Sequence, residues 1–149
     1  MTASVAPEAF KKAMRLFGGA VCVIATGQGA RRTGATINTL VPFSAEPPVV
    51  LTSLRRDGSA AQEVASTRRL TVNFLHRGQQ EVAGRFTGFG GEKGEARFAG
   101  ASWSALIEGG APALDGAIFN FDCVVDEMIE RHSHILNFCR VVAIRHGLE

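Results

Sequence analysis

The chain has 149 residues, of which 46% are hydrophobic and 20% are charged, as is typical of one compact globular domain rather than two. Its 16 Lys and Arg and 14 Asp and Glu give a net charge of only +2, which argues against nucleic acid or an anionic membrane as the main partner. The sequence has no apolar stretch of the about 18 residues that cross a bilayer, and its start lacks a signal-peptide pattern, so we expect a cytoplasmic protein with no membrane partner.

The first half of the chain predicts one helix followed by short strands. Apolar residues recur at helical spacing from Phe10 to Phe17, and Gly18-Gly19 would end this helix. Three runs rich in β-branched and apolar residues predict strands, at 20–26, 34–41 and 49–54. Pro42 and Pro47-Pro48 confine the chain between them to a sheet edge or an irregular path, because proline has no backbone N–H for a strand ladder.

The second half predicts two short helices and three further strands. Ser59 and Gln62 have the spacing of a capping box, which predicts a helix over 59–67, and a second helix is expected over 79–86. Glycine-rich stretches at 88–94 and 108–116 predict loops. Strands are expected at 70–75, 118–129 and 135–144, with the last two paired antiparallel. Because no βαβ rhythm occurs, the pattern favours a mainly β protein, a β-barrel that carries short helices.

Most familiar chemical motifs are missing. The three cysteines, Cys22, Cys123 and Cys139, have no Cys-x-x-Cys spacing, so we expect buried free thiols. His132 and His134 lie two apart, but no third ligand accompanies them, so we expect no metal site. No Gly-x-Gly-x-x-Gly joins a strand to a helix, which excludes a Rossmann nicotinamide domain.

The segment from Ser53 to Gln62 carries two arginines and a hydroxyl to the start of a predicted helix. A helix N-terminus with nearby arginines attracts phosphate groups. Taken by itself, however, the segment is better explained by an ordinary helix cap with solvated arginines.

Several short motifs follow one another along nearly the whole chain, and their order carries more information than any one of them. They include Gly18-Gly-Ala-Val-Cys-Val-Ile-Ala-Thr26, Gly34-Ala-Thr-Ile-Asn38, Thr71-Val-Asn-Phe-Leu75, Pro112-x-Leu114, and Ser133-His134 with Phe138-Cys139. This succession resembles the flavin reductase family with the FMN-binding split β-barrel, the small reductase components of two-component flavin monooxygenases. Phe121-Asp-Cys123 and the spacing from His134 to Cys139 resemble most the reductases of the pyrimidine-degradation pathway and of hydroxyphenylacetate monooxygenases.

The resemblance implies a single flavin reductase-like domain over residues 1–149 with the split β-barrel fold. It also implies NAD(P)H-dependent reduction of FMN or FAD, with NADH or NADPH as the hydride donor and with release of the reduced flavin to a separate oxygenase. A homodimer is implied as well, since the family's flavin sites lie at the subunit interface. The alternatives are a non-catalytic FMN-binding or electron-transfer protein of the same fold, and a split barrel that binds haem or serves as a scaffold.

The resemblance also assigns roles to individual residues. It places four of them along the isoalloxazine and ribityl of the flavin: Thr36, Ile37, Asn38 and Thr39. It places four more near the ribityl and phosphate: Ser53, Leu54, Arg56 and Ser59. Asn73, Arg85 and Phe86 are expected near the cofactor. His134 is the one catalytic candidate and is expected beside the nicotinamide, with a core-facing or turn histidine as the alternative.

Two departures from the family pattern stand out. Pro42 occurs where relatives usually carry a small polar residue, so one backbone donor near the flavin is lost. Relatives also continue beyond the position of Gly147 to Glu149 into a last strand with a Phe-x-Arg-x-Tyr/His pattern, which this sequence does not contain.

Overall fold

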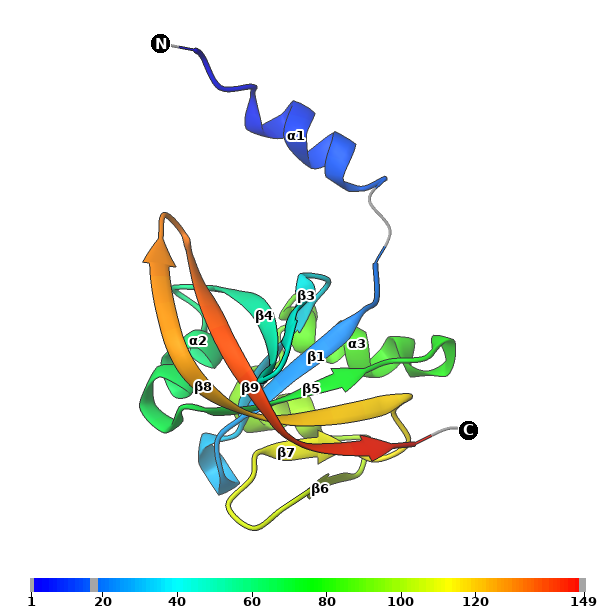
Figure 1. Ribbon diagram of the computed structural model, residues 1–149. Helices are drawn as coiled ribbons and strands as arrows, with labels where there is room; N and C mark the ends of the chain where they lie inside the picture. Colours follow the sequence, from blue (N-terminus) through cyan, green and yellow to red (C-terminus); the bar gives the residue numbers. More distant parts are fainter. Residues whose placement is uncertain (1, 17–18, 148–149) are drawn as a thin grey trace.

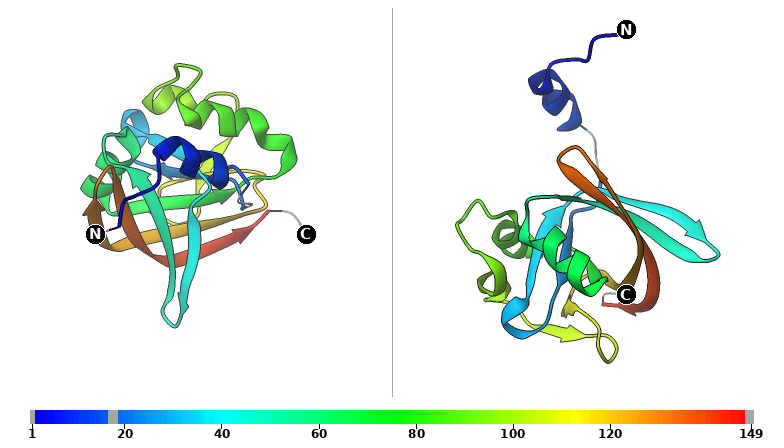
Figure 2. Two further views of the ribbon diagram at one scale, coloured as in Figure 1. Left: turned by 90° about the horizontal axis from the view of Figure 1, so that it is seen from above. Right: turned by 90° about the vertical axis from the view of Figure 1, so that its left-hand side faces the viewer.

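The computed structural model of the protein describes residues 2–16 and 19–147. Its main feature is a seven-stranded antiparallel sheet in the order β2-β1-β5-β8-β9-β4-β3, which curls into a barrel (Figures 1 and 2). The seven strands are β1 (Cys22–Thr26), β2 (Thr33–Ile37), β3 (Leu40–Ala45), β4 (Pro48–Arg55), β5 (Arg69–Phe74), β8 (Phe119–Arg131) and β9 (His134–His146). A separate hairpin pairs β6 (Trp103–Ala105) with β7 (Pro112–Leu114). The expected mainly β architecture is confirmed.

The helices are short, and one of them, over residues 59–67, contributes Ala60, Ala61 and Val64 to the core inside the barrel. They are α1 (Pro7–Met14), α2 (Ser59–Thr67) and α3 (Gln80–Thr87), with 3₁₀ turns η1 (Gly29–Arg31), η2 (Arg77–Gln79) and η3 (Gly94–Phe98). Helix α1 begins earlier than expected, because Pro7 suits the first helical turn, where no N–H is needed. Phe17 and Gly18, which were expected at its end, lie outside the described residues, as do Leu148 and Glu149. No helix in the described part of the chain is long and apolar enough to cross a membrane.

Three local expectations need correction. The run 34–41 is interrupted at Asn38 and Thr39, which separate β2 from β3. The predicted loop 108–116 contains β7, because its apolar residues are buried against β5. The capping box at α2 does not form: Gly58 is the N-cap, no side chain caps the helix, and the Ser59 hydroxyl lies 2.5 Å from that of Thr33.

Strand β3 lies at one edge of the sheet, as the prolines predicted. Pro42 pairs opposite Val50 next to a shift in register. Because only the outer side of an edge strand lacks a partner strand, a residue without an N–H is tolerated there at little cost.

Two thirteen-residue strands, β8 and β9, form a long bent ribbon (Figure 1). The turn between them is short, and His132 adopts a positive φ of 53° within it. Two register shifts, at Asp122/Cys123 and Val125/Glu127, break the regular ladder, and such shifts help a sheet to bend. The ribbon joins β5 on one side to β4 on the other, and so it links the two halves of the sheet.

The apolar core has two parts. The larger fills the barrel and contains the three cysteines, which are free and buried as expected. The smaller lies on the other face of β1, where Phe86 of α3 packs with Phe98 and Trp103 at ring-centroid distances of 5.0 and 5.4 Å. This outer cluster fixes α3 and η3 against the sheet.

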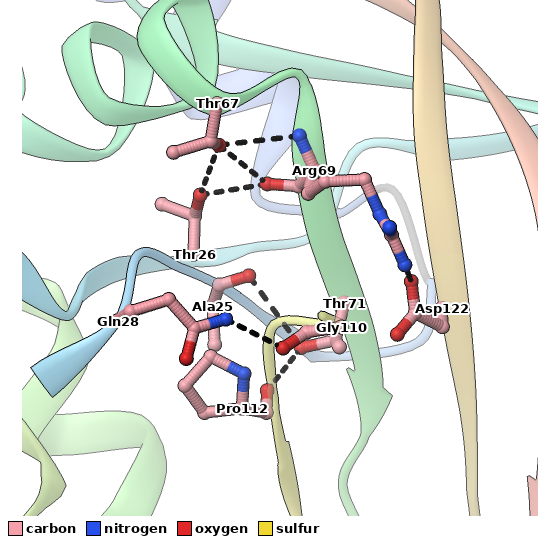
Figure 3. Close-up of polar contacts among 9 residues, drawn as sticks. All are labelled: Ala25, Thr26, Gln28, Thr67, Arg69, Thr71, Gly110, Pro112 and Asp122. Atoms are coloured by element: carbon pink, nitrogen blue, oxygen red, sulfur yellow. Dashed lines mark hydrogen bonds and ion pairs between the residues drawn. The ribbon is translucent and has the colours of Figure 1, made fainter. Parts of the chain in front are cut away.

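A polar cluster ties the far end of α2 to the sheet (Figure 3). Asp122 on β8 is completely buried, and its Oδ1 accepts a hydrogen bond of 2.8 Å from Nη2 of Arg69. Its Oδ2 has no hydrogen-bond partner among the described residues and faces Gly110, where a Cβ would collide with it. Burial raises the pKa of Asp122, and the Arg69 guanidinium opposes this shift.

Candidate functional site

A cavity of about 330 Å³ opens between β2, the end of β4, the first turn of α2 and the C-terminal end of α3. It is lined by Gly34, Ala35, Thr36, Ile37, Asn38, Thr39, Ser53, Leu54, Arg55, Gly58, Ser59, Ala60, Phe86, Thr87, Arg97 and His134. Nine of the residues predicted from the sequence are therefore brought together: Thr36, Ile37, Asn38, Thr39, Ser53, Leu54, Ser59, Phe86 and His134.

One wall of the cavity is an unpaired sheet edge. Strand β2 comes first in the sheet order, so in the described part of the chain no strand pairs with its outer side. The Thr36 hydroxyl donates a hydrogen bond of 2.6 Å to the carbonyl of Ala83, which holds β2 against α3. Backbone N–H and C=O groups of an edge strand need partners, and a flat heterocycle with donors and acceptors along its rim can supply them.

The first turn of α2 forms another part of the wall. Gly58, Ser59 and Ala60 line the cavity there, and the first N–H groups of a helix have no partner within the helix. Beside them, the exposed Arg55 guanidinium meets Asp57 through two contacts of 3.2 Å. These hydrogen bonds and the attraction between the charges lower the pKa of Asp57. This side of the cavity is suited to an anion.

His134 lies at the start of β9, opposite Arg55 in the β4–β9 ladder. Its side chain is exposed at the cavity, which excludes the core-facing alternative but not the alternative of a turn histidine. The Ser133 hydroxyl lies 2.9 Å from Nδ1, while Nε2 makes no hydrogen bond to a described residue. The imidazole therefore has one nitrogen available for a ligand in the cavity.

Three predicted residues do not line the cavity. Arg56 points elsewhere and pairs with Glu130 at 3.0 Å. Asn73 is fully buried, where its Nδ2 donates to the carbonyl of Val23 at 2.9 Å and its Oδ1 accepts from the backbone N–H of Leu114. Asn73 thus supports the fold beside the site, whereas Arg56 forms an ion pair at the surface.

Arg85, the third of these residues, binds backbone carbonyl groups instead of lining the cavity. It donates hydrogen bonds to the carbonyls of Ala96, at 2.9 Å, and Arg97, at 3.3 Å. It thereby fixes η3, the segment that brings Arg97 to the cavity. Neither Arg97 nor Arg55 was identified as a site residue from the sequence.

Strand parity could have revealed Arg55. The buried positions of β4 alternate at Val50, Thr52 and Leu54, so Ser53 and Arg55 share the opposite face. A site that contains Ser53 should therefore contain Arg55 rather than Arg56. Strand parity does not apply to Arg97, which reaches the cavity through the path of the glycine-rich loop.

Metal-ligating side chains do not cluster in this region. Within residues 2–16 and 19–147, no three His, Cys, Asp or Glu side chains are grouped in a way that could hold a metal ion. The polar groups of the cavity are instead backbone amides, hydroxyls, arginines and one imidazole.

The barrel thus carries a cleft that is lined by an edge strand, a helix N-terminus and arginines. Residues 14–149 match the family described as flavin reductase like domain, and the chain belongs to this family. Over 144 residues it is 35% identical to the FMN reductase (NADH) RutF of Pseudomonas syringae pv. syringae, an overlap of 97% of this chain and 79% of the relative.

Two solved structures are similar over nearly their whole length. The NADH:FAD oxidoreductase SgcE6 of Streptomyces globisporus has a TM-score of 0.81 and 26% identity, with 98% of this chain and 88% of that chain covered. The styrene monooxygenase flavin reductase of Pseudomonas putida S12 has a TM-score of 0.78 and 26% identity, with 92% and 87% covered. The resemblance to flavin reductases and the split β-barrel fold are confirmed.

Proposed function

We propose that this protein catalyses the reduction of FMN by NADH and supplies the reduced flavin to a separate oxygenase. The observation that carries the proposal is the cavity itself, where the unpaired edge of β2 and an anion-binding side meet in a member of the flavin reductase family. The relatives support NADH as the donor, and one of them supports FAD as an alternative flavin. When bound, the flavin ring supplies the hydride acceptor.

The residues of the cavity suit this ligand. We expect the backbone from Thr36 to Thr39 to bind the polar rim of the ring, because these residues continue the unpaired edge of β2. Leu54 and Phe86 supply apolar surface. Ser53 and Ser59 offer hydroxyls towards the ribityl chain. Orienting two flat rings and excluding water requires no acid–base pair, which agrees with this set of side chains.

His134 is the residue that we expect at the nicotinamide. It is exposed at the cavity, and its Nε2 has no described hydrogen-bond partner. A neutral imidazole can donate or accept one hydrogen bond through this nitrogen, and the carboxamide of the nicotinamide offers both kinds of partner. Its role is to position the donor rather than to transfer a proton.

The active form is proposed to be a cytoplasmic homodimer. Helix α1 stands away from the barrel (Figure 1), and none of its residues is buried. Phe10 and Met14, one helical turn apart, are 56% and 43% exposed. An apolar helix face that covers nothing in its own subunit is available to a second copy. Light scattering during gel filtration tests this, and a monomer at micromolar protein with FMN present would contradict it.

The decisive assay for the activity is NADH oxidation, followed at 340 nm with and without added FMN. We expect consumption that depends on FMN, and bleaching of the flavin when oxygen is excluded. A non-catalytic flavin carrier would bind FMN but leave NADH unchanged. A protein that binds neither flavin would contradict the proposal altogether.

A further inference from the structure

The turn that carries His134 is fixed to the segment that leads into α2. It consists of His132 and Ser133, and His134 is the first residue of β9. The backbone N–H of Arg56 donates a hydrogen bond of 2.9 Å to the carbonyl of Ser133, and the Arg56 guanidinium pairs with Glu130 on β8 at 3.0 Å. An exposed ion pair contributes little, so the backbone hydrogen bond is the main contact. The end of the long ribbon is thus held beside the cavity.

The side chain of Ser133 meets the imidazole that follows it. Its hydroxyl lies 2.9 Å from Nδ1 of His134 and makes no other hydrogen bond to a described residue. The two nitrogens of the ring are distinct, and only one orientation of the imidazole brings Nδ1 to this hydroxyl. The contact therefore selects that orientation and leaves Nε2 as the nitrogen that is available to a ligand.

A hydrogen bond at one nitrogen of a neutral imidazole also determines which nitrogen carries the proton. A hydroxyl that donates to Nδ1 requires this nitrogen to be unprotonated, and the ring proton is then on Nε2. The hydroxyl proton of Ser133 has no acceptor among the described residues other than Nδ1. Unlike a carboxylate, Ser133 also adds no negative charge that would favour the imidazolium form. It is therefore suited to present a neutral ring with Nε2–H as the donor.

We propose that Ser133 is a positioning residue for the reduction. Its hydroxyl holds His134 in one orientation and one tautomer, so that Nε2–H is ready to donate to the carboxamide oxygen of the nicotinamide. This proposal rests on the proposed function, in which His134 contacts the hydride donor. Ser133 does not line the cavity, so it acts through the imidazole alone. Its effect on the reaction should disappear when His134 is absent.

The tautomer can be measured without any turnover, from the nitrogen-15 chemical shifts of the imidazole in protein labelled at histidine. The signals of His134 are those that vanish in His134→Ala. At pH 8, where an ordinary imidazole is neutral, we expect the wild type to carry the ring proton on Nε2, with and without FMN. Ser133→Ala should change both shifts. A wild type with the proton on Nδ1, or shifts that Ser133→Ala leaves unchanged, would overturn the proposal.

A double-mutant cycle on kcat/KM for NADH tests the effect on the reaction. Ser133→Ala should lower this ratio by about 2- to 5-fold, the range for one hydrogen bond, while FMN affinity and the melting temperature stay unchanged. The same substitution in a His134→Ala background should change the ratio by less than about 1.5-fold, because the two residues act as a unit. Ser133→Thr keeps the hydroxyl and should restore the wild-type ratio.

His132→Asn is the matched control in the same turn. His132 has a positive φ of 53°, a conformation that asparagine adopts readily, and it does not line the cavity. Its replacement should leave both kcat/KM for NADH and the ring shifts of His134 unchanged. A loss as large as that of Ser133→Ala would show that the turn as a whole, rather than the Ser133 hydroxyl, positions the imidazole, and would contradict the proposal.

Two kinetic results would also overturn the proposal. If the loss caused by Ser133→Ala persists in full in the His134→Ala background, Ser133 does not act through the imidazole. If Ser133→Thr fails to restore the ratio although it folds with the wild-type melting temperature, the hydroxyl is not the group that matters. A wild type that does not oxidise NADH would refute the proposed function instead, and the ring shifts would still show whether Ser133 determines the tautomer.

Discussion

Gly34 is the glycine of the cavity whose replacement has the most predictable effect. A Cβ at this position would collide with the carbonyl oxygen of Ile24 and lie 2.9 and 3.0 Å from two ring atoms of Phe86. The Ile24 oxygen belongs to the backbone of β1, so it cannot turn aside as a flexible side chain would. Gly34→Ala therefore requires β1 and β2 to separate or Phe86 to move out of the outer core.

Overpacking of this kind typically costs about 1 to 3 kcal/mol. For a domain of this size each kcal/mol lowers the melting temperature by about 2 to 4 °C, so we expect a decrease of about 2 to 12 °C. Differential scanning calorimetry, or chemical unfolding at 25 °C, measures the effect. FMN affinity should decrease as well, because the Gly34 carbonyl accepts a hydrogen bond from Arg97, which lines the cavity.

Gly84→Ala is the control for this change. Gly84 lies in the middle of α3, and a Cβ added there would meet no atom within 4 Å. Alanine should therefore raise stability by about 0.5 to 1 kcal/mol through its better helix propensity. If Gly34→Ala melts within about 1 °C of the wild type, on the scale of degrees per kcal/mol used above, the described packing of β1, β2 and Phe86 is wrong.

Three further predictions concern single side chains. His134→Ala should raise the KM for NADH or slow flavin reduction by about 2- to 10-fold, while FMN affinity and the melting temperature stay nearly unchanged. If His134 were a structural residue instead, its replacement would lower the melting temperature and leave the turnover number unchanged. Burial raises the pKa of Asp122 above the 3.8 of an unfolded chain, so the folded protein holds this proton more tightly and gains stability at this site as the pH falls through the raised pKa. Urea unfolding at a series of pH values from 7 down towards the unfolded pKa should therefore show wild type gaining stability relative to Asp122→Asn as the pH falls, and a relative gain with rising pH would contradict the sign. Burial raises the pKa of Cys22 and Cys139 to about 12 and raises that of Cys123 as well, so a thiol reagent at pH 8 should label none of the three until the protein is unfolded.

Most of the helices and strands were predictable because the residue pattern of a short segment reflects the conformation that this segment prefers by itself. The β-branched run of β1 and the spacing of β8 and β9 are such patterns, and both were found close to their expected bounds. The capping box failed for a reason that is not local. Its serine hydroxyl has an alternative partner, Thr33, which precedes it by 26 residues and reaches it only in the folded chain.

The site was partly predictable for the same reason. Thr36 to Thr39 and Ser53 to Ser59 are continuous segments, so a family resemblance carries them over together. Arg97 depends instead on where a glycine-rich loop returns to the barrel, and no spacing rule specifies that path. Asn73 lies in a recognisable motif, but its buried hydrogen bonds show that a motif residue can support the fold rather than bind a ligand.

The place of β8 and β9 in the sheet order has a consequence for biosynthesis. The sheet consists of two groups of strands, β2-β1-β5 and β4-β3, and both groups are synthesised early. They are joined only through β8 and β9, which follow every other strand in the chain. At about 5 to 20 residues per second, several seconds of synthesis pass with unpaired strand edges exposed on the nascent chain. The cavity between β2, β4 and the start of β9 can therefore form only after nearly the whole chain has emerged.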